Sequence, residues 1–317
     1  MPFTSKAVVE LSDDWILDLR PPKNRVDPTR PYAYLVEPEY GLNGCVDDVA
    51  TVFLTNSECP FRCLMCDLWK NTTEDRVPVG SVASQVEWAL GRLPPVPRVK
   101  LYNSGNFFDE QAISRQDRSR IVELVAGHRA VVVESHPRLV DERCAAFADA
   151  LAPKLEVAMG LETIDPNVLP RLNKRMTLED YECATRFLTG HGMAVRAFIL
   201  LRTPFQSEEE GVDWALRSIE YAFSIGVSCC AVIPTRAGNG AMEALQAGGL
   251  FEPPTLPSIE RVLERGIEMN QGRVFMDLWD LEKFHSCTVC GPARKKRLSE
   301  MNLQQTILPP VECGCNA

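Results

Sequence analysis

The sequence predicts an α/β fold, an open and partial (β/α)6 barrel of the TIM type. Apolar runs rich in β-branched residues recur from residue 48 onward, and amphipathic helical stretches lie between them. This alternation implies parallel βα units joined by right-handed crossovers. The strand pattern fades after Ile233, which favours an open six-unit barrel over a closed barrel of eight. A flat, doubly wound sheet is the competing topology.

The expected strands and helices follow one another in a regular order. Strands are expected at 49–55, 99–102, 130–134, 155–160, 194–201 and 227–233. Helices are expected at 81–93, 114–126, 140–152, 177–191 and 208–224. The loop between residues 55 and 81 is long, bears cysteines and shows little helix signal. Because catalytic groups usually lie in loops at the carboxyl ends of barrel strands, we expect the chemistry in this loop.

Two further regions flank the expected barrel, which spans residues 47–240. Residues 1–46 are rich in proline and weakly periodic, so we expect a segment that wraps the barrel and not a separate domain. Residues 241–317 are expected to form a C-terminal extension. This extension carries a second cysteine group and a basic run at 294–297.

Composition excludes several classes of protein. The net charge of −9 over 317 residues opposes a broad nucleic-acid-binding surface. No apolar run approaches the roughly 20 residues of a membrane span. Acidic residues interrupt the N-terminal segment where a signal peptide would be apolar, so we expect a cytoplasmic protein. In that compartment, the 12 cysteines indicate metal ligands and buried thiols, not disulfides.

The first cysteine group is a C-x3-C-x2-C array directly after the first expected strand. Its members are Cys59, Cys63 and Cys66. Three thiolates at this spacing can bind three irons of a [4Fe–4S] cluster and leave the fourth iron without a protein ligand. A structural zinc loop or buried free thiols are the alternatives. A closed zinc site needs four ligands, however, and no histidine lies near this group in the sequence.

This loop resembles that of the radical S-adenosylmethionine (SAM) superfamily, and the resemblance extends over residues 48–235. It implies an enzyme in which SAM binds the open iron. An electron from the cluster would cleave SAM to a 5′-deoxyadenosyl radical, which abstracts hydrogen from an organic substrate. The residue before the third cysteine is commonly aromatic in the superfamily. Here it is Met65, whose thioether can cover the adenine ring.

The resemblance also implies SAM-binding positions at the ends of the later strands. The second-strand turn lacks the acidic residue that is common in the superfamily, so its amide, hydroxyl and carbonyl groups would bind the methionine amino group. Glu134 and Glu162 could instead be solvated loop carboxylates, and Arg196 a surface arginine. The candidate positions are Asn103, Ser104, Gly105, Glu134, Ser135, Glu162 and Arg196.

The second cysteine group combines a C-x2-C pair with a C-x-C pair. Its members are Cys287, Cys290, Cys313 and Cys315. Two such pairs commonly form a closed site of four thiolates, which would hold the C-terminal extension against the barrel. Zinc and an auxiliary iron–sulfur cluster both fit this spacing, and Gly314 between the last two cysteines favours zinc. His285 could substitute as a ligand or lie at the surface.

Within the superfamily, the chain is most similar to the radical subunit of archaeosine synthases and to related tRNA-modifying enzymes. The stretches that carry this similarity are 100–109, 132–137, 160–163 and 198–205. They imply a C–N bond cleavage on a modified tRNA base, an external electron donor of the flavodoxin or ferredoxin type, and no membrane partner.

Three features oppose a tRNA enzyme that acts alone: the net charge, the short basic run, and the lack of a recognisable RNA-binding module. A partner subunit could supply the RNA contacts. Alternatively, the substrate could be a small metabolite or a peptide in a biosynthetic pathway. A non-enzymatic electron-transfer protein is a further alternative, and it would make the polar strand ends incidental.

Overall fold

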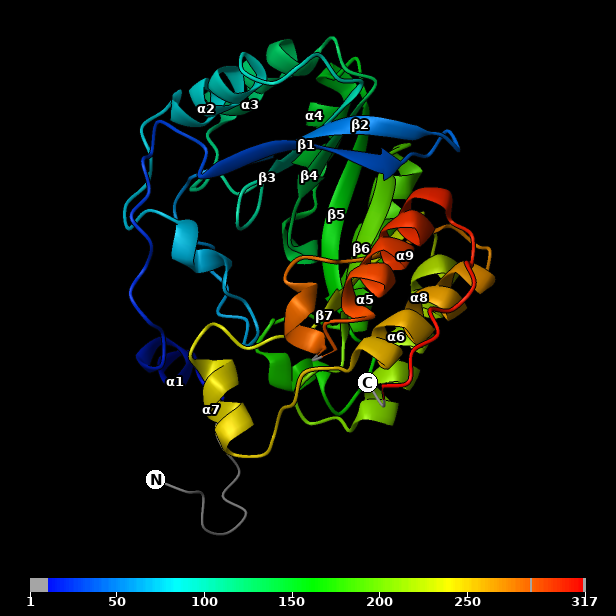
Figure 1. Cartoon of the computed structure of the whole chain (residues 1–317). Coiled ribbons are helices and arrows are strands. Elements are labelled where there is room, and N and C mark those ends of the chain that lie inside the picture. Colours follow the sequence, from blue (N-terminus) through cyan, green and yellow to red (C-terminus); the bar gives the residue numbers. More distant parts are fainter. Residues whose placement is uncertain (1–10, 286, 316–317) are drawn as a thin grey trace.

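A computed structural model describes residues 11–285 and 287–315, and its centre is one curled sheet (Figure 1). The strands lie in the order of the sequence, and each pairs with its neighbour. β1 is antiparallel to β2, and the pairs from β2 to β8 are parallel. The strands are β1 Ala33–Tyr40, β2 Val46–Phe53, β3 Arg98–Tyr102, β4 Ala130–Glu134, β5 Lys154–Glu162, β6 Ala194–Leu201, β7 Cys229–Pro234 and β8 Arg273–Met276.

Most helices cover the convex face of this half-barrel (Figure 1). Two of them begin with capping boxes, in which Thr177 and Asp180 or Ser207 and Glu210 satisfy free backbone N–H groups. The helices are α1 Asp13–Asp18, α2 Ser81–Leu90, α3 Arg115–Val125, α4 Glu142–Ala150, α5 Leu178–Gly190, α6 Glu208–Ser224, α7 Ala241–Ala247, α8 Leu256–Glu268 and α9 Gly291–Gln304. None of the described helices is long and apolar enough to cross a membrane.

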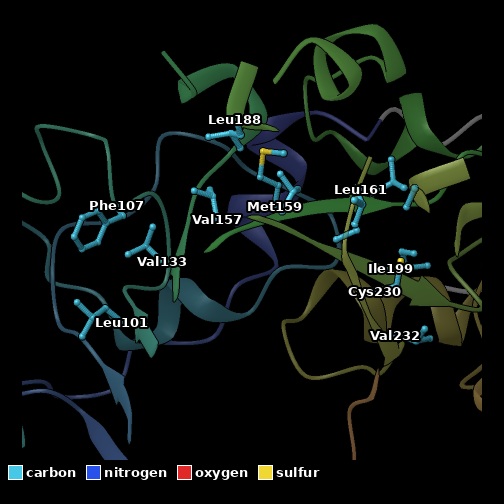
Figure 2. Close-up of a cluster of buried hydrophobic side chains, with 14 of the residues drawn as sticks. Leu101, Phe107, Val133, Val157, Met159, Leu161, Leu188, Ile199, Cys230 and Val232 are labelled. Atoms are coloured by element: carbon cyan, nitrogen blue, oxygen red, sulfur yellow. The ribbon is translucent and has the colours of Figure 1, made fainter. Parts of the chain in front are cut away.

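The two faces of the curled sheet carry different residues. One face of each inner strand is fully buried against the helices, as Leu101, Val133 and Val157 show (Figure 2). The opposite face carries the side chains that alternate with them. There the rings of Tyr102 on β3 and Phe198 on β6 lie 6.2 Å apart, although two strands separate them in the sheet. The expected curled sheet is therefore confirmed, and the flat alternative is wrong.

The six expected strands correspond to β2 to β7, and the sheet continues beyond them at both edges. β1 lies in the proline-rich N-terminal segment, where Pro38 and two glutamates interrupt the apolar pattern typical of a strand. Pro38 is tolerated because β1 is an edge strand. β8 has only four residues, too few to give a clear alternation. The sequence pattern was weakest at the two edges for these reasons.

Helix α9 covers the seam between the two edges of the sheet, because it contacts both β1 and β8. Its side-chain amides pair with the free edge of β8. Asn302 accepts from Met276 N (2.9 Å) and donates to Met276 O (2.8 Å). Gln305 does the same with Val274, at 2.7 and 2.9 Å. These bonds satisfy backbone groups that a ninth strand would otherwise bind.

Helices α1 and α7 lie side by side next to the cysteine loop (Figure 1). They share a second, smaller apolar cluster that includes Ile16, Met242 and Leu64 of the cysteine loop. Met65 packs against the same cluster. Segments that precede and follow the loop in the sequence thus hold it in place, and it projects beyond the carboxyl ends of the strands.

Candidate functional site

Cys59, Cys63 and Cys66 lie in the loop that follows β2, at the carboxyl ends of the parallel strands. Burial raises the pKa of all three thiols, that of Cys63 to about 11. A lone thiolate is therefore disfavoured in this site. A bound cationic group reverses that preference because it stabilises the thiolate form directly.

The loops that follow β5 and β7 form hydrogen bonds with the backbone of this cysteine loop. Asn239, just before α7, donates to the carbonyl groups of Leu64 (2.8 Å) and Cys66 (3.1 Å). The loop after β5 contributes two more bonds. Leu64 N donates to Leu172 O (2.9 Å), and Asn173 donates to Arg62 O (2.7 Å). Hydrogen bonds from separate elements hold the cysteines in one arrangement before any ligand binds.

The turn after β3 touches the first cysteine directly. Asn106 donates to Cys59 Sγ (3.2 Å), and a Cβ on Gly105 would lie 3.4 Å from the Cβ of Cys59. Glu134, at the end of β4, accepts the N–H groups of Asn103 (2.7 Å) and Gly105 (3.3 Å). Burial raises the pKa of Glu134 to about 7, although these N–H groups oppose the shift. The structure thus brings the predicted second-strand turn together with Glu134.

His136 anchors the cysteine loop from the turn after β4. Its ring stacks on Phe61, with 3.8 Å between the centroids and 13° between the planes. Its Nε2 donates to Lys174 O (2.9 Å), and its Nδ1 accepts from Arg138 N (3.2 Å). Burial lowers the pKa of His136 to about 3, so the ring is neutral. The neighbouring Ser135 is buried and donates to His136 O.

A buried ion pair lies at the end of β5. Lys174 Nζ and Glu162 Oε1 are 2.6 Å apart, and both side chains are under one-tenth exposed. Glu162 has a φ of 65°, in the left-handed region that few non-glycine residues adopt. A Cβ on Gly160 would lie 2.1 Å from Glu162 Oε1 and 2.4 Å from Lys174 Nζ. A side chain at Gly160 would therefore displace the carboxylate of Glu162 and the ammonium of Lys174.

Arg196 lies in a buried network of charges inside the half-barrel. Its guanidinium donates to Glu39 on β1 (2.8 and 3.1 Å) and to Glu156 on β5 (2.7 Å). Arg98, Lys100 and Arg273 pair with the same two carboxylates. Arg196 is not the surface arginine of the alternative interpretation. Its role as a SAM ligand stays a prediction, and it would require these bonds to open.

Several buried polar atoms at the strand ends lack a hydrogen-bond partner. They belong to residues that directly follow β2, β3, β6 and β7, and so they share one end of the barrel. Orphaned buried groups are rare in folded proteins and commonly mark a bound ligand or water. SAM carries ammonium, carboxylate and hydroxyl groups that could satisfy them, so these residues fit it. The atoms are Thr55 Oγ1, Asn56 Oδ1, both amide atoms of Asn103, Thr203 Oγ1 and Thr235 Oγ1.

Most of these orphaned residues were not predicted from the sequence, and neither were Lys174 and Asn239. A signal was present, because Thr203 and Thr235 come just after expected strands. Their significance lies in the missing hydrogen bonds, which only the folded chain reveals.

Aromatic side chains line the concave face next to these polar strand ends. The ring of Phe53, at the end of β2, contacts Tyr32 (5.6 Å), Tyr102 (6.1 Å) and Trp279 (6.2 Å). Tyr32 Oη lies 3.1 Å from Ser104 Oγ. Trp279 is 56% exposed, and its carbonyl group accepts from Arg236 (2.6 Å). A planar or apolar substrate could pack against these rings.

The four C-terminal cysteines form a second, compact centre. Their sulfur atoms lie within 4.8 Å of one another, the arrangement that a metal ion requires. His285 does not join them, and its ring instead packs against Gly291, where a Cβ would lie 2.1 Å from it. The cysteine tetrad is therefore a candidate site for an additional metal.

Comparison with known proteins places these features in context. No protein-family model matches the chain. The chain is 27% identical over 296 residues to archaeosine synthase subunit beta of Methanosarcina acetivorans, and the match covers 86% of this chain and 84% of that protein. The protein of the same name from Thermococcus kodakarensis is 29% identical over 217 residues, covering 63% and 65%.

Among solved structures, a radical SAM methyltransferase from Sphaerobacter thermophilus has a similar fold. Its TM-score is 0.53 at 15% identity, and the match covers 78% of this chain and 76% of that one. At this level of identity the likeness concerns the fold alone.

Proposed function

We propose that this chain is a radical SAM enzyme, of a branch related to tRNA-modifying enzymes, and that Cys59, Cys63 and Cys66 bind its [4Fe–4S] cluster. When bound to these residues, the cluster and SAM would supply radical chemistry, the abstraction of hydrogen from an organic substrate by a 5′-deoxyadenosyl group. The observation that carries this proposal is the convergence of the three thiols and the orphaned polar atoms at one end of the barrel. The parallel strands β2 to β7 would then form its (β/α)6 barrel.

The chain's own residues would bind and orient SAM. Asn103 is the leading candidate, because both of its amide atoms are buried without a partner beside the cysteine loop. Glu134 positions the Asn103 turn through two backbone bonds. The remaining proposed SAM-binding residues are Met65, Ser104, Gly105, Ser135, Glu162 and Arg196.

The proposed organisation of the chain keeps three regions. Residues 47–240 would form the radical SAM barrel, and residues 1–46 would wrap it. Within the latter region, β1 contributes Glu39 to the buried charge network. Residues 241–317 would form the extension with the additional metal.

The proposed substrate is a modified tRNA base, cleaved at a C–N bond, because the relatives are named archaeosine synthase subunit beta. The word subunit in that name supports a partner protein that supplies RNA contacts. Arg294 and Arg297 of the basic run pair with Glu260 and Glu264 of α8, which leaves Lys295 and Lys296 as the exposed cations of this run. A flavodoxin or ferredoxin would supply electrons. A small metabolite or a peptide stays the alternative substrate.

The first step can be tested without knowing the substrate. Anaerobically reconstituted protein should release 5′-deoxyadenosine when it is given dithionite and SAM, and Cys63→Ala should release none. Cys183→Ala, which removes an exposed cysteine on α5, is the matched control and should retain the activity. Failure of the wild-type protein to cleave SAM, with a fully assembled cluster and with candidate substrates present, would contradict the proposal.

A further inference from the structure

Four thiols from two separate segments converge at one end of α9. Cys287 and Cys290 lie just before the helix, and Cys313 and Cys315 lie near the end of the chain. Cys287 Sγ is 3.9 Å from Cys313 Sγ, and Cys290 Sγ is 3.5 Å from Cys315 Sγ. These separations are far longer than the roughly 2.05 Å of a disulfide, so the four side chains are free thiols.

We propose that these four cysteines bind one zinc ion in a closed tetrahedral site. A Zn–S bond of about 2.3 Å places the sulfurs of a regular tetrahedron about 3.8 Å apart. The two separations given above lie on either side of this value, and all four sulfurs lie within 4.8 Å of one another. The site needs no further ligand, because four thiolates complete the coordination of a structural zinc.

The same distances oppose an auxiliary iron–sulfur cluster. A [4Fe–4S] cluster takes each thiolate on a different iron, so its cysteine sulfurs must lie farther apart than the ligands of one ion. Within 11–285 and 287–315, no other group of three or more Cys, His, Asp or Glu donor atoms lies as close as this tetrad. The three thiols after β2 are thus spread more widely. The chain holds two kinds of cysteine site with two different spacings.

The local structure presents the first two thiols in a turn that suits a metal ion. Gly291 N donates to Cys287 O (3.1 Å), and this bond closes the turn that brings Cys290 to the start of α9. Val289, between the two cysteines, is 81% exposed, so the apolar side chain points away from the sulfurs into solvent. Because the side chain between the two ligands does not enter an apolar core, we expect the bound metal to stabilise this turn.

The last two thiols are directed to this site by Arg297 of α9. Its guanidinium donates to the carbonyl groups of Leu308 and Pro309 (2.5 to 3.1 Å) and pairs with Glu264 of α8 (2.6 Å). These bonds guide the chain back along α9 toward its first residue. Zinc would then lock the return segment to the start of the helix.

The zinc ion would keep α9 on the seam of the half-barrel. Asn302 and Gln305 at the other end of α9 hold the edge of β8, but each of these four amide hydrogen bonds is individually weak. The ion fixes the opposite end of the helix. The ring of Trp279, shortly after β8, contacts the ring of Phe53 beside the polar strand ends. The zinc site therefore supports the wall of the candidate active site without taking part in chemistry.

Metal analysis of the full-length protein tests this proposal directly. Wild-type protein should contain about one zinc per chain in addition to the iron and sulfide of its iron–sulfur cluster. The double variant Cys313→Ser/Cys315→Ser should lose the zinc and keep its iron and sulfide. Cys45→Ser/Cys183→Ser, which removes two exposed cysteines, is the matched control and should keep both metals.

Two results would overturn the proposal. One is that the Cys313→Ser/Cys315→Ser variant loses about four irons together with their sulfide, and the other is that the four cysteines of the wild-type protein bind neither zinc nor iron. X-ray absorption at the zinc edge covers the case in which the variant does not fold. It should show four sulfur neighbours at about 2.3 Å in the wild-type protein, and oxygen or nitrogen neighbours in their place would contradict a cysteine site. None of these readouts depends on SAM cleavage, so the proposed enzymatic function is tested separately.

Discussion

The two cysteine groups of this chain differ in what surrounds their sulfur atoms. The first group lies in a partly buried loop, where Asn106 donates to one sulfur and other strand ends hold the backbone. The second group ranges from the buried Cys290 to the exposed Cys313, and its four sulfurs gather close together. The spacing in sequence predicts both groups, whereas their surroundings distinguish the proposed open, reactive centre from the proposed closed, structural one.

The largest expected effect on stability comes from the ion pair beside the first group. Lys174→Met leaves the buried Glu162 without its partner, and such a loss typically costs about 3–5 kcal/mol. Urea unfolding should measure it. Lys283→Met, which breaks an exposed pair with Asp280, is the matched control and should cost below about 1 kcal/mol. Equal losses in the two variants would show that the environment of the first group is not special.

Glu134→Gln should change how stability depends on pH. The pKa of Glu134 is raised to about 7 in the folded protein, so the folded state binds its proton more tightly than the unfolded state. Ionisation therefore destabilises the fold as pH rises from about 4.5 to 7, by up to about 3 kcal/mol. The variant should gain that much relative to the wild type across this window. Glu179→Gln on exposed α5 should show no such trend, and a constant gap for Glu134→Gln would refute the assignment.

How much of this site could be predicted from the sequence depends on how local each signal is. The cysteine arrays and β2 to β7 were predictable, because strand periodicity and thiol spacing are properties of short segments. The partners of Arg196 could not be predicted, because Glu39 lies 157 residues away on β1, where proline and charged residues interrupt the strand pattern. The Lys174–Glu162 pair likewise depends on how the loop after β5 folds back.

The seam of the half-barrel offers a test of the second group's structural role. Asn302→Ala removes two hydrogen bonds to Met276 and should cost about 1–2 kcal/mol. Hydrogen exchange at β8 should speed up, while the exchange of β3 stays unchanged. Ser299→Ala, at an exposed position of the same helix, is the control. Unchanged exchange at β8 in Asn302→Ala would show that α9 does not protect this edge.

The smallest expected effect concerns the aromatic contact that anchors the first group. Phe61→Leu removes the stack on His136 and should cost about 0.5–1.5 kcal/mol. Because the ring orients the cysteine loop, the rate of SAM cleavage should fall several-fold with the iron content unchanged. Phe187→Leu breaks a similar contact with His191 on α5 and serves as the control. A rate that falls equally in both variants would remove Phe61 from the positioning residues.

The most direct test of the difference between the two groups is the electron paramagnetic resonance spectrum of the dithionite-reduced protein, recorded before and after addition of SAM. An open iron on the Cys59, Cys63 and Cys66 cluster predicts that SAM shifts the g-values of the reduced cluster. The Cys313→Ser/Cys315→Ser variant should show the same spectrum and the same shift. A spectrum that SAM leaves unchanged, or a second iron–sulfur signal that disappears in this variant, would contradict the account.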